Sequence, residues 1–565
     1  MVTLRINVLT NSDDAFVSWA PSGFIKGCRG FMIERKRNVG SKEYLDILEN
    51  RVGFDGDRAR SGEHRPSSEW PFQRFNWTDH AVNVGNRVRY RVTAMIDSGS
   101  GRPFGAGPSS SWTPWAELTA NCGQGFSAFF NRGLILSQFV ARYMKSRKLN
   151  ARQLKQSLVD SLDPKFRAFL EGDLGAALRS LLKDSSKSGS IHAALYELHE
   201  SSLEDALIRL GSRAHIVLAN GSDKSGDGNS DARDHLNSEG VATIDRLLRS
   251  KGLGHNKFVV FSRAGKAHSV WTGSTNWATT GLCTQINNGL LIKHAGMAGI
   301  FRKQWNRLRD ASPPDTDPAA FPDTLVASND APTTISVGKA KTTVWFTRTS
   351  AGADMDELRS LIEEAKQAVL FLMFTPGSGG LHLQAAKRAT EKDMLVRGVV
   401  STLGNQAGNA RQNVLDVKLI GAAGKAMRDR YSVVQPQGAE GMPSWIAEVT
   451  RGKFLSSIGH AIVHSKILVI DPLSAHPLVV TGSHNFSTPA SRRNDENFVV
   501  VRDHPRLARA YAAHVMSVYQ HYRYRSYVRE MLAQDKQPWN KLENDDAWLK
   551  HQLKSKSVEL AYWAG

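Results

Sequence analysis

The chain has 565 residues, with 73 Lys and Arg against 54 Asp and Glu, so its formal net charge is +19. This length predicts about three to four folded units, and the positive charge favours a polyanionic partner, either nucleic acid or an anionic membrane surface. The three cysteines, Cys28, Cys122 and Cys283, lie far apart without CxxC spacing, so the sequence indicates neither a disulfide framework nor a thiolate zinc site.

The beginning of the sequence, "MVTLRINVLTNSDDAF", has neither the basic segment nor the apolar core of a secretory signal. No apolar run reaches the length of about 18 residues that a membrane span needs. We therefore expect a cytoplasmic protein without a transmembrane segment, and export without a cleavable signal stays open.

Residues 1–120 read as short strands between turns, and apolar and polar residues alternate in "RVRYRVTAMID", as in a strand with one buried face. This pattern predicts a β-sandwich. Trp19 on an early strand and the stretch "YRVTA" at 90–94 resemble a fibronectin type III domain. The resemblance implies a spacer or a module that binds a protein partner.

Downstream, helical periodicity begins at about residue 121, and strands then alternate with helices. "SIHAALYELH" and "AVLFLMF" each begin a strand, helix, strand unit, which predicts an α/β layer sandwich made of two halves. We expect the first half at 121–310, a linker rich in Pro, Asp and Thr at 311–336, the second half at 337–503, and a helical extension at 504–565. In that extension, Tyr522, Arg523, Tyr524, Arg525 and Tyr527 form either a nucleic-acid stacking strip or, as we favour, part of the core with solvated arginines.

A polar motif occurs twice, once in each half. "HNKFVVFSRAGKAHSVWTGSTN" begins at residue 255, and "HSKILVIDPLSAHPLVVTGSHN" begins at residue 464. The matching residues have identical spacing in the two copies. They are His255, Lys257, Gly273, Ser274 and Asn276 in the first copy, and His464, Lys466, Gly482, Ser483 and Asn485 in the second.

The spacing has a physical meaning. Residues two apart on a strand share a face, so each histidine projects beside its lysine. The glycine allows close approach of the backbone to a ligand, and each asparagine is expected at the start of a helix, where free N–H groups favour an anion. Each copy thus predicts a site for one phosphate-sized group, with Ser274 and Ser483 as substrate-binding hydroxyls.

These paired motifs resemble those of the phospholipase D superfamily, in which H-x-K-x4-D is followed by G-S-x-N. The second copy has the acid, Asp471, whereas the first has Ser262; we expect this position to support structure. The resemblance also implies a carboxylate that orients a catalytic histidine. Glu496 lies 32 residues after His464, and the same offset from His255 gives Asn287, so we expect Glu496 to serve His464 and Asn287 to serve His255.

The resemblance further implies one active site between the halves, in which one histidine attacks phosphorus and the other protonates the leaving oxygen. The family assignment makes His255 the nucleophile, although a carboxylate on His464 argues for the reverse. The lysines and asparagines would stabilise the charge of the transition state, so we expect no metal and no cofactor.

The substrate stays open between two phosphodiesters. The net charge and the stretches "VHSKILVID" and "TGSHNFS" favour nucleic acid, whereas Met442, Trp445 and Ile446 in the insertion at 404–463 would suit a lipid surface. The same insertion carries Lys418, Lys425, Arg428 and Arg430, which suit phosphates. A phospholipase D is therefore the alternative to a nuclease, a membrane-bound cardiolipin synthase is disfavoured, and an inactive anion-binding scaffold is the third reading.

Overall fold

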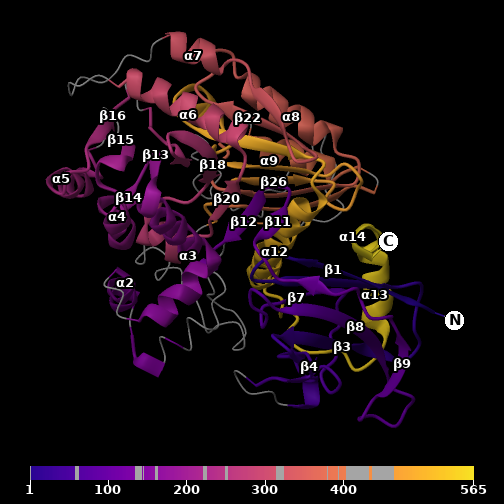
Figure 1. Cartoon of the computed structure of the whole chain (residues 1–565). Coiled ribbons are helices and arrows are strands. Elements are labelled where there is room, and N and C mark those ends of the chain that lie inside the picture. Colours follow the sequence, from indigo (N-terminus) through magenta and orange to yellow (C-terminus); the bar gives the residue numbers. More distant parts are fainter. Residues whose placement is uncertain are drawn as a thin grey trace.

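The computed structural model describes residues 2–57, 63–133, 143, 146–149, 151–159, 163–220, 226–248, 252–312, 323–377, 380–391, 393–401, 432–434 and 463–564. Two large sheets lie side by side, and a smaller β unit lies below them (Figure 1). This arrangement confirms the predicted fold class, two similar α/β halves preceded by a β-sandwich.

The N-terminal unit is built from two antiparallel sheets. One contains β1 (Leu4–Thr10), β2 (Ala15–Pro21) and β7 (Asn76–Asp79). The other contains β3 (Cys28–Val39), β4 (Lys42–Ile47), β8 (Arg87–Ile96), β9 (Gly105–Ser109) and β10 (Ala116–Glu117). The alternation in β8 places Val88, Tyr90 and Val92 in the core with no exposed surface. The closer resemblance to fibronectin type III stays a prediction.

The C-terminal helices fold back onto this sandwich. Helices α13 (Ala547–Ser555) and α14 (Ser557–Ala564), yellow in Figure 1, lie against the indigo and violet strands. Trp548 donates a hydrogen bond from Nε1 to the carbonyl of Cys28 at 2.9 Å, and Trp563 packs edge-on against Phe16. Both ends of the chain therefore build one unit.

The two α/β halves share one strand order. The first sheet runs β11 (Asn121–Gly123), β12 (Phe126–Phe130), β20 (Asn288–Ile292), β18 (Lys266–Gly273), β17 (Lys257–Arg263), β13 (Gly189–Leu195), β15 (Ala214–Ala219), β16 (Thr243–Arg246). The second runs β21 (Thr333–Val337), β22 (Ala340–Phe346), β28 (Asn497–Arg502), β27 (Leu478–Gly482), β26 (Ile467–Ile470), β23 (Ala368–Met373), β24 (Leu395–Val400), β25 (Val433–Val434). In each half, the motif therefore includes the fifth strand of the sheet order, β17 or β26, followed along the chain by the fourth, β18 or β27.

Helices cover both faces of the two sheets. The outer faces carry α3 (Pro164–Ser188) and α4 (Ser201–Ile208) in the first half, and α8 (Ala353–Glu364) and α9 (Leu381–Arg388) in the second. The inner faces share one apolar core with α6 (Ala295–Asp310) and α12 (Pro505–Ala533). Among the described residues, no helix is both long and apolar enough to cross a bilayer.

Shorter elements complete the description. They are β5 (Glu49–Asn50), η1 (Asp55–Asp57), β6 (Arg65–Pro66), α2 (Ala151–Val159), β14 (Leu198–His199), η3 (Gly211–Arg213), α5 (Ser230–Ser238), β19 (Trp277–Ala278), the π-helix η4 (Thr280–Thr284), α7 (Asp323–Asn329) and α11 (Thr488–Arg492). The predicted linker at 311–336 thus contains α7 and the first residues of β21. The basic and apolar residues predicted for the insertion at 404–463 lie outside the described residues. Tyr522 is buried in α12, as the packing alternative for that strip predicts, but Arg525 is buried as well, whereas that alternative predicts solvated arginines.

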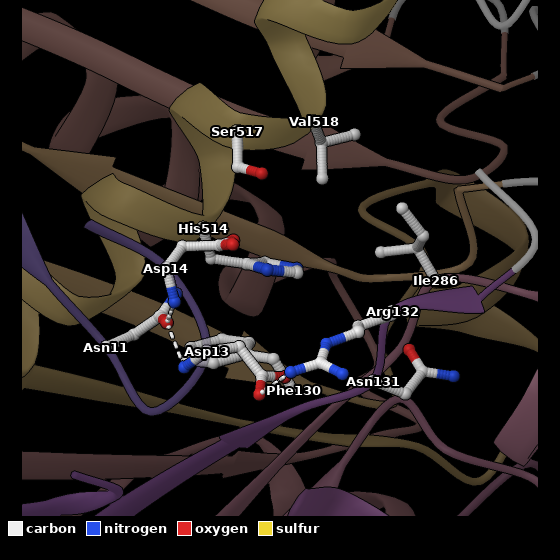
Figure 2. A pocket seen from close by; sticks show the side chains of 10 residues that line it. All are labelled: Asn11, Asp13, Asp14, Phe130, Asn131, Arg132, Ile286, His514, Ser517 and Val518. Atoms are coloured by element: carbon white, nitrogen blue, oxygen red, sulfur yellow. Dashed lines mark hydrogen bonds and ion pairs between the residues drawn. The ribbon is translucent and has the colours of Figure 1, made fainter. Parts of the chain in front are cut away.

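A small pocket marks the junction of the sandwich, the first half and α12 (Figure 2). At its edge Arg132 forms an ion pair with Asp13 at 2.8 Å. The neighbouring Asn131 accepts the backbone N–H of Asn287 at 2.7 Å and donates to the carbonyl of Leu282, also at 2.7 Å. Asn131 therefore fixes the segment that carries Asn287.

Candidate active site

The two halves meet through a reciprocal pair of hydrogen bonds between their central strands. Thr272 of β18 donates to Asn497 Oδ1 at 2.6 Å, and Asn288 Nδ2 donates to Thr481 of β27 at 2.8 Å. Thr272 and Thr481 occupy matching positions in the two motifs, as do Asn288 and Asn497 after them. The contact therefore has pseudo-twofold symmetry, and it brings the two motifs to one place.

The residues that orient the two histidines are exchanged between the halves. His255 Nδ1 lies 3.1 Å from Glu496 Oε1, and His464 Nδ1 lies 2.9 Å from Asn287 Oδ1. The prediction that each half orients its own histidine is therefore wrong. The offset along the chain correctly identified Glu496 and Asn287 as the two orienting residues. The pseudo-twofold contact, however, places each of them against the histidine of the other half. In both pairs Nδ1 is engaged, which leaves Nε2 for a substrate.

Glu496 is held in place by further contacts. It accepts a hydrogen bond from Asn494 Nδ2 at 2.8 Å and another from the backbone N–H of Asn485 at 3.0 Å. The carboxylate has no exposed surface. Its orientation toward His255 is therefore fixed before a substrate binds.

We expect Glu496→Gln to lower kcat by about 10²-fold or more, because the amide cannot stabilise charge on His255 as the carboxylate does. Steady-state kinetics on a small phosphodiester would measure it. Glu357→Gln is the matched control, since Glu357 pairs with Arg502 away from the motifs at 2.8 Å. Equal activity of wild type and Glu496→Gln would contradict the role of this carboxylate.

Each lysine lies beside the histidine of its own motif and under an aromatic ring. Lys257 Nζ donates to the carbonyl of His255 at 2.9 Å and lies 4.7 Å from the Tyr196 ring. Lys466 donates to the carbonyl of His464 and lies 5.1 Å from the Phe374 ring. The same two rings pack against the imidazoles, with centroids 4.6 Å and 4.8 Å apart. The site therefore has matching aromatic walls.

The two motif asparagines differ in their contacts. Asn276 Nδ2 donates to Glu197 Oε2 at 2.6 Å, which leaves its second amide hydrogen for a ligand. Asn485 binds Glu496 through its backbone. Neither asparagine begins a helix, contrary to the prediction, because Asn276 precedes β19 and α11 begins at Thr488 with Ser487 as its N-cap.

The motif serines are structural, which corrects their predicted substrate-binding role. Ser274 and Ser483 have no exposed surface. Ser274 Oγ lies 2.8 Å from Asn287 Oδ1 and accepts the backbone N–H of Asn288 at 3.0 Å. Ser483 Oγ accepts the backbone N–H of Asn497 at 3.1 Å. Both hydroxyls therefore hold the segments that carry the orienting residues.

The second motif has an acid, Asp471, where the first has Ser262, because the backbone before the neighbouring strand differs between the two halves. That strand is β23 in the second half and β13 in the first. Asp471 accepts three backbone N–H groups before and at the start of β23, from Lys366, Gln367 and Ala368, at 2.7–2.8 Å. In the first half α3 runs directly into β13, and the N–H of Gly189 is satisfied by the carbonyl of Ser185. An acid at position 262 would therefore find no corresponding free donors at the start of its neighbouring strand.

Burial makes the site unfavourable for positive charge. Burial, and then the Lys257 ammonium, lower the pKa of His255 to about 4, although Glu496 raises it. Burial lowers the pKa of Lys257 to about 7, although Glu496 and Glu197 raise it. Burial and neighbouring cations also hold the pKa values of His464 and Lys466 well below their ordinary range. An anionic substrate would counteract these shifts.

The pH dependence follows from these directions. We expect kcat/KM to fall at low pH, where His255, with a pKa of about 4, gains a proton. On the alkaline side kcat/KM should fall in two steps, first as His464 loses its proton, because burial and neighbouring cations hold its pKa well below the ordinary range, and then above about pH 7 as Lys257 loses one. The alkaline limb of kcat should lie at higher pH than that of kcat/KM, because a bound phosphodiester raises the pKa values of the neighbouring cations. Rates measured at saturating and limiting substrate check both limbs.

Glu197→Gln tests the assignment of the alkaline limb. Because Glu197 raises the pKa values of Lys257 and Lys466, its removal should move the alkaline limb of kcat/KM to lower pH. Glutamine can still accept the Asn276 hydrogen bond, so geometry is preserved. An unmoved limb would show that neither lysine controls it.

Sequence reasoning missed Tyr196, Glu197, Phe374, Asn494 and Asn131. The two aromatics had a detectable signal, since each directly follows the strand that precedes the helix in its repeat. Glu197 has Thr375 at the corresponding position, so the repeat gave no indication of it. Asn131 and Asn494 act on orienting residues, which only the three-dimensional structure identifies.

A family model matches the part of the chain that contains the second motif. Residues 358–519 match a family model described as "Cardiolipin synthase, PLD-like domain", and no curated protein matches the sequence. Similar solved structures include phosphatidylserine synthase from Haemophilus influenzae Rd KW20, with 13% identity, a TM-score of 0.44, and coverage of 71% of this chain and 94% of that one. Yeast tyrosyl-DNA phosphodiesterase has 11% identity, a TM-score of 0.33 and coverage of 58% and 88%. Nuc from Salmonella typhimurium, described as a phospholipase D family member, has 17% identity, a TM-score of 0.22 and coverage of 32% and 96%. By the family model, residues 358–519 are similar to a phospholipase D-like domain.

Proposed function

We propose that this phospholipase D-like protein is a phosphodiesterase that cleaves nucleic acid through a phosphohistidine intermediate. The observation that carries the proposal is the exchange of orienting residues, Glu496 on His255 and Asn287 on His464. It leaves two imidazole Nε2 atoms and two ammonium groups for one phosphodiester. This set supplies a nucleophile, an acid and charge stabilisation.

We assign the attack to His255. Its Nε2 forms the bond to phosphorus, and the positive charge that develops on the ring is stabilised by Glu496. The P–O bond to the leaving group breaks, and that oxygen takes a proton from His464 Nε2. Asn287 is uncharged and so orients His464 without stabilising its positive charge, which makes the proton easier to release.

Hydrolysis of the intermediate reverses the roles. His464, now neutral, takes a proton from a water molecule as the water oxygen attacks phosphorus. The P–N bond breaks, and its electron pair returns to His255. Lys257 and Lys466 neutralise the non-bridging oxygens, so the charge that a metal ion would balance falls on these two side chains.

Nucleic acid is the favoured substrate because the chain has a net charge of +19, which favours a phosphate backbone. A phospholipid is the second candidate, since the family model matching residues 358–519 is described by a lipid enzyme.

The two substrates can be separated directly. The full chain would be incubated, with EDTA present, with single-stranded DNA, duplex DNA, RNA and vesicles of phosphatidylcholine and phosphatidylglycerol. We expect cleavage of nucleic acid, weakening as salt rises, and loss of cleavage in His255→Ala. Release of headgroups from vesicles without cleavage of nucleic acid would assign the lipid instead. A requirement for added magnesium would contradict the metal-free mechanism.

A further inference from the structure

A group of basic side chains lies between α6 and the first half of the sheet, apart from the catalytic pairs. It consists of His192 of β13, His215 of β15, and Arg302, Trp305 and Arg309 of α6, and is called the α6 basic cluster below. His192 lies three residues before Leu195, which pairs with Lys257 at the catalytic end of the sheet. His215 is the second residue of the neighbouring strand β15.

The α6 basic cluster has a defined geometry. His192 and His215 are register partners on adjacent parallel strands, and their rings stack with centroids 4.3 Å apart. Arg302 and Arg309, seven residues apart on one helix, both lie over the Trp305 ring, at 5.4 Å and 5.6 Å from its centroid. Arg302 Nη1 contacts His192 Nδ1. His192 is buried, His215 and Arg302 are half-buried, and Arg309 is exposed, so the cluster opens to solvent on one side.

The charges in this cluster are poorly balanced. Among the described residues, no carboxylate pairs with His192, His215 or Arg302, and Arg309 pairs only with its neighbour Asp310. Burial, and then Arg302, lower the pKa of His192 to about 2. Burial and the two arginines also lower the pKa of His215. Burial, and then Arg309, lower the pKa of Arg302, so this half-buried cation, paired with no carboxylate of the described residues, is expected to bind an anion.

The second half fills the same position differently. Val260 and Val469 each follow their motif histidine by five residues, and they pair with His192 and Leu370 respectively. The register partner of Leu370 is Arg397, whose guanidinium binds Glu559 at 2.7 Å. The fold therefore does not require a histidine at the position of His192, where the second half has Leu370. At the position of His215 the second half has a basic residue, Arg397, but there a carboxylate balances it.

We infer that the α6 basic cluster is a second anion site, which binds a phosphate group between His215, Arg302 and Arg309. Planar guanidinium groups match phosphate oxygens in pairs, and the indole holds both in place. The ligand is either a backbone phosphate of a long nucleic acid or a free phosphate. The inference does not rest on the proposed function, because none of these side chains contacts the catalytic pairs.

The test uses the full chain with its histidine rings labelled with ¹⁵N, and inorganic phosphate as the probe. Signals of His192 and His215 are assigned with His192→Gln and His215→Gln. We expect phosphate to raise the pKa of His215, and Arg302→Gln to weaken this response about tenfold or more. Arg302→Lys should retain part of it. Arg359→Gln, which removes a partly exposed arginine paired with Asp356 on α8, should leave it unchanged.

A second measurement identifies the source of the phosphate. If the site takes a backbone phosphate, Arg302→Gln raises KM for a long oligonucleotide but not for bis(p-nitrophenyl) phosphate. If it takes free phosphate, Arg302→Gln leaves both KM values unchanged, while the wild type still shows the histidine response to phosphate. A folded protein whose His192 and His215 signals do not respond to phosphate would overturn the inference. An inactive protein that still shows the response would contradict only the proposed function.

Discussion

His464→Ala should release one equivalent of p-nitrophenolate from bis(p-nitrophenyl) phosphate in a rapid burst and then turn over at least about 10³-fold more slowly than wild type. A good leaving group needs no proton, so His255 can still attack phosphorus. The phosphohistidine then persists, because the base that activates water is gone. Rapid-mixing absorbance measures the burst, and mass spectrometry of peptides locates the phosphoryl group on His255.

His255→Ala should give no burst and no covalent adduct. A burst in His255→Ala with the adduct on His464 would reverse the assignment of the two histidines. The nucleophile would then not be the histidine that Glu496 contacts. Wild-type biological function in both variants would favour the non-catalytic scaffold. Circular dichroism of both proteins shows that a lost burst does not reflect unfolding.

Asp471→Ala should lower the free energy of unfolding by about 3 kcal/mol or more, because three backbone N–H groups would lose a shared charged acceptor. Its counterpart, Ser262→Ala, should change stability by less than about 0.5 kcal/mol. The Ser262 hydroxyl is buried and has no partner among the described residues, so its removal exposes no unsatisfied group. Urea denaturation followed by circular dichroism compares the two.

Ser262→Asp gives the sharper contrast. Restoring the family acid should destabilise the protein by about 2 kcal/mol or more and should not raise activity, since the carboxylate would be buried beside a strand whose first N–H is already bonded to α3. A stabilised or faster Ser262→Asp variant would show that the first motif is decayed.

The sequence predicted the elements that depend on local pattern. The motif spacing located both histidine and lysine pairs, and the repeated strand, helix, strand units predicted two similar halves. The sequence could not predict that each orienting residue contacts the histidine of the other half, because Glu496 and Asn287 lie at the same offset from the histidines of their own halves. Only the packing of β18 and β20 against β27 and β28 places each beside the other half's histidine.

The role of Ser262 also needed tertiary information. The sequence shows that an acid is missing, but the reason lies in α3, which enters β13 without the turn that precedes β23. Similarly, Ser274 and Ser483 look like ligands in sequence because they follow a glycine at the site. Their hydroxyls are used by Asn288 and Asn497, whose backbone positions depend on strand pairing.

The unequal partners of the two histidines also set a direction for the substrate. With identical halves, a phosphodiester could bind in either of two opposite orientations, and either of its ester bonds could break. Here a carboxylate lies behind one imidazole and a neutral amide behind the other, so with the roles proposed above the leaving oxygen would lie on the His464 side. A strand threaded through the site would therefore be cut with one polarity, and its new ends would carry the phosphate always on the same side of the break.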